Sequence, residues 1–115
     1  MPAFFCDLHR SVADYELLSA AACDLAGKPS VSEDGWRMLR AGVAAARRRA
    51  ERLAELEDHS AGTVGALNAD LLDREGPAAV LARAWARLAR AIADNHDELR
   101  RLPSGADLRA VLAAA

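Results

Sequence analysis

The stretch GPAAVLARAWARLARAIADNHDELRRL, residues 76–102, repeats its large side chains at alternating steps of four and three residues. Such spacing places them on one stripe of a helix packed lengthwise against near-parallel neighbours. We therefore predict a long helix over 77–102, opened by Pro77 and ended before Pro103. The stripe consists of Leu81, Trp85, Leu88, Ile92, Asn95, Leu99 and Leu102.

Asn95 is the only polar member of this stripe, so we expect a polar residue in the core. In coiled coils one such Asn sets the register or the oligomeric state. The alternative is that Asn95 hydrogen-bonds a loop backbone at the end of the bundle.

Two further long helices precede this stretch, over about residues 5–26 and 33–58. Gly27, Lys28 and Pro29 end the first, and Ser30 or Ser32 caps the second. Each has an inner apolar stripe, and that of the second helix again alternates steps of three and four. Those stripes comprise Phe5, Leu8, Val12, Tyr15, Ala22 and Leu25 in the first helix, and Trp36, Leu39, Val43, Ala46, Ala50 and Leu53 in the second.

Shorter elements complete the prediction. Glycines in 60–65 indicate a break, followed by a short helix over about 63–75. Ser104 and Asp107 have the spacing of a capping box and predict a last short helix. The sequence therefore predicts an all-α fold, an antiparallel helical bundle of three long helices plus one or two short ones, as a single domain over 1–115.

Composition narrows the function classes. The chain is alanine-rich, with 28 alanines among 115 residues, and its net charge of −2 gives no general attraction for nucleic acid or anionic membranes. No apolar run reaches the length of a membrane span. Cys6 and Cys23 lie on one helix about 25 Å apart, so they cannot form a disulfide there. Free thiols and the lack of a signal peptide favour the cytoplasm.

A cysteine and three histidines suggest a metal- or ligand-sensing alternative. Cys6 and His9 begin the first helix, His59 closes the second and His96 lies near the end of the long helix. If the short third helix crosses back, all four converge at one end of the bundle. Thiolate and imidazole ligands together suit zinc. Without that convergence, no cofactor is expected.

His59, followed by Ser60-Ala61-Gly62, resembles the site of histidine phosphotransfer domains, which are also small helical bundles. Those domains carry an exposed His in the middle of a helix, with an apolar residue, Lys and Gly soon after it. The resemblance implies a phosphoryl-accepting role for His59. A small helical enzyme is a further alternative, for which Asn95, His96 and Tyr15 are the residues to examine first.

Arginines gather in two places. Arg47, Arg48, Arg49 and Arg52 cluster on the second helix, and Arg83, Arg87 and Arg90 form a stripe on the long helix. They are suited to phosphates or to an acidic partner, or else form solvated faces.

No sequence motif specifies a reaction, which favours a non-enzymatic protein that associates with itself or with a helical partner protein. A helix that is apolar on two faces must bury both. The expected interface therefore combines the alanine strip beside the heptad stripe with Trp85 and the C-terminal segment. Its residues are Ala82, Trp85, Ala86, Ala89, Ala93, Leu108, Val111 and Leu112.

Overall fold

The computed structural model describes residues 3–29, 33–65 and 76–114, with side chains over 4–29, 33–57 and 76–113. This part of the chain is helical and contains no strand, which confirms the predicted all-α bundle. The elements are α1 (Ala3–Ala26), α2 (Glu33–Gly65), α3 (Pro77–Asp94), the 3-10 helix η2 (His96–Arg101) and α4 (Gly105–Ala114).

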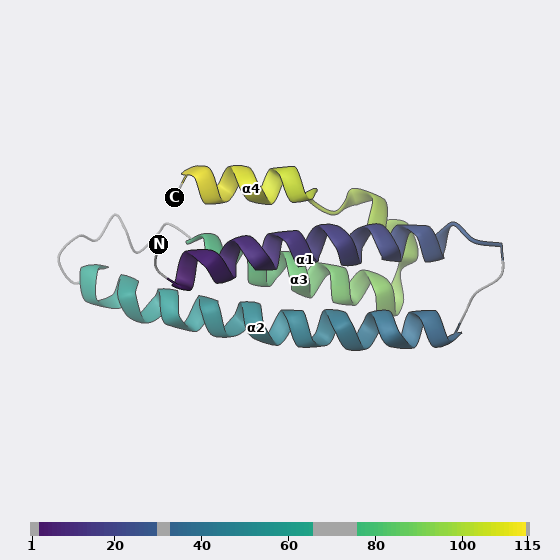
Figure 1. Ribbon diagram of the computed structural model, residues 1–115, viewed down its shortest axis with the longest axis horizontal. Helices are drawn as coiled ribbons and strands as arrows, with labels where there is room; N and C mark the ends of the chain where they lie inside the picture. The colour runs from purple at the N-terminus through teal and green to yellow at the C-terminus, as the bar shows by residue number, and fades with distance from the viewer. Residues whose placement is uncertain (1–2, 30–32, 66–75, 115) are drawn as a thin grey trace.

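The long helices lie side by side in alternating directions (Figure 1). Helix α2 runs back along α1, and α3 runs back along α2, so α1 and α3 point the same way. Helix α3 packs most extensively on α2, and α4 returns along the outside of α1. The bundle thus has two ends: one where α1 and α3 begin, and one where they finish and α2 begins.

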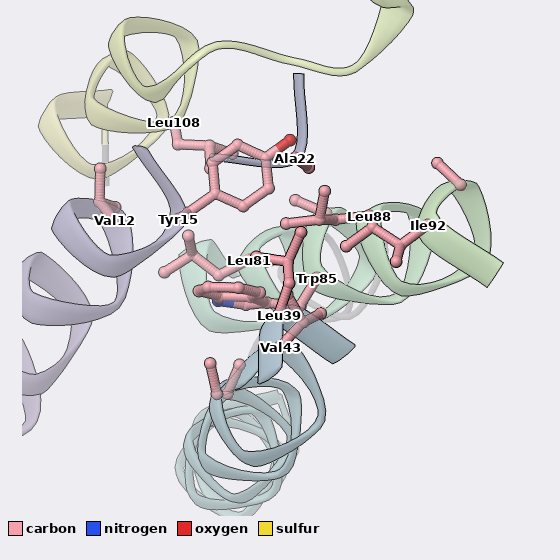
Figure 2. Close-up of a cluster of buried hydrophobic side chains, with 14 of the residues drawn as sticks. Val12, Tyr15, Ala22, Leu39, Val43, Leu81, Trp85, Leu88, Ile92 and Leu108 are labelled. Carbon is pink, nitrogen blue, oxygen red and sulfur yellow. The ribbon is translucent and has the colours of Figure 1, made fainter. Parts of the chain in front are cut away.

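The predicted stripes form the core. Side chains from α1, α2, α3 and α4 meet in one apolar cluster, part of which is shown in Figure 2. Its largest fully buried members are Trp85, Tyr15, Leu8, Leu81, Leu88, Ile92, Val12 and Val43. Phe5, which we predicted on the inner stripe of α1, is 43% exposed, so that placement is wrong.

The centre of the core is polar at one point. The indole Nε1 of Trp85 donates a hydrogen bond to Oγ of Ser11, 2.8 Å away. The Tyr15 ring meets the Trp85 ring edge to face, with centroids 5.4 Å apart. These contacts join α1 to α3, and the bond to Ser11 satisfies an indole N–H that burial would otherwise leave unpaired.

Glu57 of α2 caps the N-terminus of α3. Its carboxylate accepts from the backbone N–H groups of Ala78 (3.0 Å) and Ala79 (3.3 Å). Pro77 occupies the first turn, as predicted, and Gly76 precedes it. A methyl group on Gly76 would overlap the Glu57 carboxylate, so the close approach depends on glycine at this position.

Helix α4 begins at the predicted capping box. The Ser104 N–H donates to Asp107 Oδ2 (3.0 Å), and the Asp107 N–H donates to Ser104 Oγ (3.1 Å). The Tyr15 hydroxyl donates to the carbonyl of Pro103 at 2.9 Å, and Arg109 pairs with Glu16 of α1. The C-terminal helix is therefore held on its own bundle.

The long helix is shorter than predicted, because α3 ends at Asp94. Asn95 is extended (φ −151°, ψ 91°), and its side chain accepts from the Asp97 N–H instead of entering the core. The His96 ring nitrogen Nε2 hydrogen-bonds the Ile92 carbonyl (2.9 Å), which a continuing α-helix would use for the His96 backbone N–H. The placement of Asn95 in the core is wrong, whereas its bond to backbone at the bundle end is confirmed.

The predicted break at 60–65 is also wrong, since α2 continues to Gly65. Glycine costs a helix only about 1 kcal/mol relative to alanine and does not by itself end it. The predicted short helix over 63–75 lies, beyond Gly65, outside the described residues. The same holds for the caps predicted at Ser30 and Ser32.

Candidate interaction surface

One face of α3 is made of alanines, between the buried stripe and the charged side of the helix. Ala82, Ala86 and Ala89 are half-buried and Ala93 is exposed. They follow one another at steps of four, three and four residues, which aligns them along the helix axis. The strip is therefore a flat surface of methyl groups, about 16 Å long at 1.5 Å per residue.

A groove of about 460 Å³ lies beside this strip, between α2 and α3. Its apolar lining includes Val43 and Ile92, each about 1% exposed, and the exposed Ala44. Its polar lining consists mainly of arginine. The complete lining is Arg40, Val43, Ala44, Arg47, Arg48, Glu51, Ala89 and Ile92.

The charge of the groove is mostly positive. Arg47 pairs with Glu51 at 2.9 Å within α2. Arg40 and Arg48 are exposed and make no ion pair within the part of the chain that the structure describes. Two guanidinium groups therefore remain available to an external acceptor.

The predicted arginine cluster of α2 is divided between two grooves. Arg47 and Arg48 line the α2–α3 groove, whereas Arg49 and Arg52 line a second groove of about 540 Å³ between α1 and α2. Arg49 lies 3.8 Å from Asp14 of α1. The cluster is thus not one continuous binding surface.

Arg40 is a member of the α2–α3 groove that the sequence interpretation did not include. It precedes Arg47 by seven residues and Arg48 by eight, which is two turns of helix. That spacing places it on the same face. The signal in the sequence is thus the helical spacing of the arginines, which follows the same rule as the spacing of apolar residues.

Three predicted interface residues have other roles. Trp85 is fully buried between α1, α2 and α3, so its assignment to an interface is wrong. Leu108 is 2% exposed, and Leu112 packs partly buried against the same core. The segment with Leu108, Val111 and Leu112 covers its own bundle, because Tyr15 and Glu16 hold α4 there.

The proposed zinc ligands do not converge. Cys6 and His9 are exposed near the start of α1, where α3 also begins. His96 lies at the opposite end, stacked on Trp36 of α2 with ring centroids 4.3 Å apart. The two ends of α1 are separated by more than about 25 Å. The prediction of a zinc site that joins Cys6 and His9 to His96 is therefore wrong. It required the end of α3 to lie beside the end of α2, whereas the start of α3 lies there.

His59 lies within α2, six residues before its end at Gly65, and not at the helix terminus. Its side chain lies outside the described residues. Among the side chains that are described, no group of three His, Cys, Asp or Glu is placed to hold a metal ion.

The residues named for an enzyme are engaged in structural contacts. Asn95 caps η2, and His96 bonds Ile92 and stacks on Trp36. Burial raises the pKa of Tyr15 to about 12, an effect that Arg87 partly opposes. A tyrosine with this pKa that donates to Pro103 is not poised to accept a proton at neutral pH.

No protein-family model, curated protein or solved structure matches this chain. Of the helices that the structure describes, none is long and apolar enough to cross a membrane.

Proposed function

We propose that the protein acts without catalysis, by associating with another protein chain along the surface formed by the α2–α3 groove and the alanine strip of α3. The observation that carries the proposal is the continuity of this surface. Ala89 lines the groove together with Val43, Ala44 and Ile92, and Ala82 and Ala86 continue the strip along α3 beyond it. Small side chains let a second helix approach closely, which favours helix-on-helix packing.

The neighbouring surfaces support the same proposal by contrast. On its other side α3 packs against α4 of its own chain, and Arg87 pairs with Glu98 at 2.9 Å; the groove of about 520 Å³ that remains there is shared with α4. The outer side of α1 likewise carries α4. The alanine strip is an apolar part of α3 that directly adjoins the contact with α2 and carries no helix among the described residues.

We also propose that this association takes place in the cytoplasm. Cys6 and Cys23 are both exposed and unpaired, which suits a reducing compartment.

Site-specific photo-crosslinking tests the proposal. A benzophenone amino acid is introduced at Ala44 or Ala93, both exposed on the proposed surface, and at Ala13, an exposed residue of α1, as a control. Irradiation of the cells that express the protein is expected to give discrete adducts from positions 44 and 93 but not from 13. Equal yields at all three positions, or no adduct at 44 and 93, would overturn the proposal.

A further inference from the structure

We infer that the occupant of the α2–α3 groove is an acidic amphipathic helix of a different protein, and not a second copy of this chain. The inference rests on the proposed function and specifies the partner.

Charge points to an acidic partner. The exposed guanidinium groups of Arg40 and Arg48 line the groove without an ion pair among the described residues. Arg90, exposed on α3 four residues after Ala86, borders the other side of the alanine strip. A helix lying on the strip therefore has guanidinium groups along both sides, and each can take a carboxylate in a bidentate pair.

The same charges disfavour a symmetric dimer. In a two-fold dimer one surface patch meets its own copy. Arg40, Arg48 and Arg90 of one chain would then face arginines of the other, with Glu51 already occupied by Arg47. Like charges brought together at an interface oppose association, whereas an acidic partner removes this repulsion.

The shape of the surface favours a helix. The strip and the groove run along two antiparallel helices, and the strip repeats at steps of four and three residues. Large side chains at the same spacing on a partner helix would fit between the methyl groups. The partner helix is thus expected to carry Leu, Ile or Phe on one face and Asp or Glu on both flanks of that face.

The adducts formed at positions 44 and 93 identify the occupant when their peptides are sequenced by mass spectrometry. Adducts to an acidic helical segment of another protein support the inference. Adducts to this chain itself, or to a segment without flanking carboxylates, overturn the inference of an acidic partner helix. They leave the proposed function, association along this surface, intact. The absence of any adduct overturns both.

Charge reversal provides a matched test. The double variant R40E/R48E is expected to lower the adduct yield at position 93 by about tenfold or more, as when like charges replace opposite ones. The control R100E/R101E makes the same change in net charge on exposed arginines of η2 and is expected to leave the yield unchanged. Circular dichroism establishes that both variants are folded. An undiminished yield in R40E/R48E contradicts the inference.

A defined probe tests the chemistry in vitro. A stapled helical peptide with Leu at steps of four and three and Glu on both flanks is compared with the same peptide carrying Lys in place of Glu. Fluorescence anisotropy is expected to show about tenfold or more tighter binding of the Glu peptide, weakened by salt. Equal binding of the two peptides overturns the inference.

Discussion

Trp85 and Ser11 share a 2.8 Å hydrogen bond between an indole N–H and a hydroxyl group, across 74 positions of sequence. Trp85 is completely buried, and this hydroxyl is the acceptor for its indole N–H. This bond joins the helix that begins the chain to the helix whose alanine strip forms the proposed interaction surface.

Replacing Ser11 with Ala is expected to destabilise the protein by about 1–3 kcal/mol, because the Trp85 N–H would remain buried without an acceptor. Urea unfolding measures this change in the free energy of unfolding. The control is S19A, since Ser19 makes only a long local bond of 3.3 Å to Glu16 on the same helix. A loss in S11A no larger than that in S19A would show that the bond is not a significant source of stability.

Replacing Glu57 with Ala is expected to cost about 1 kcal/mol, the usual value of a lost N-cap. The exposed Glu55, two residues earlier on α2, provides the control E55A. Thermal or urea unfolding of both variants makes the comparison.

Gly76 and Glu57 are expected to be coupled. The variant G76A destabilises the protein because its methyl group displaces the Glu57 carboxylate from the start of α3. In an E57A background that collision is absent, so G76A is expected to cost less there. Additive effects in the double-mutant cycle would contradict the close contact.

Ionisation of Tyr15 is expected to weaken the protein in alkali. Burial raises its pKa from the ordinary value of 10.0 to about 12 in the folded chain. The neutral hydroxyl therefore contributes stability that is complete below pH 10 and is lost as the pH rises towards 12. The difference in free energy of unfolding between wild type and Y15F is expected to be constant below pH 10 and to shrink above it. A difference independent of pH over this range would contradict the burial of the hydroxyl.

Removing the His96 ring is expected to expose Trp36. The two rings are stacked with an interplanar angle of 11°, and Trp36 is only 2% exposed. The variant H96A is expected to shift tryptophan emission to longer wavelength and to increase quenching by acrylamide, because Trp36 becomes exposed to water. Trp85 is completely buried away from His96, so its contribution is expected to stay constant. The exposed His9 at the other end of α1 provides the control H9A. Identical quenching in H96A and wild type would refute the role of His96 as a cover.

The helices were predictable because their signals are local. The stripes of α1 and α2, the Pro77 start and the Ser104–Asp107 box depend on residues within one or two turns of each other. Contacts between distant positions were not predictable in this way. Nothing in the sequence near Gly76 indicates that Glu57 will cap α3, and nothing near Trp85 indicates Ser11.

The errors have different physical causes. Apolar spacing continues from Ile92 to Leu99, but Asn95 and His96 offer the backbone side-chain hydrogen bonds that end α3. The zinc prediction required α3 to finish beside the end of α2, and spacing within one helix says nothing about the direction of the next. The alanine strip was found from sequence, whereas its combination with Arg40 required the packing of α2 on α3.

Helix α1 also carries two labelling sites at a fixed separation. Its exposed thiols, Cys6 and Cys23, accept a pair of spin labels or fluorophores in one reaction, at a separation of about 25 Å fixed by the helix rise. The Cys23 sulfur lies 4.0 Å from the Leu99 carbonyl oxygen of η2, so a label there senses any displacement of that segment. The label on Cys6, at the remote end of the same rod, gives an internal reference for conformational change when a ligand or another chain is added.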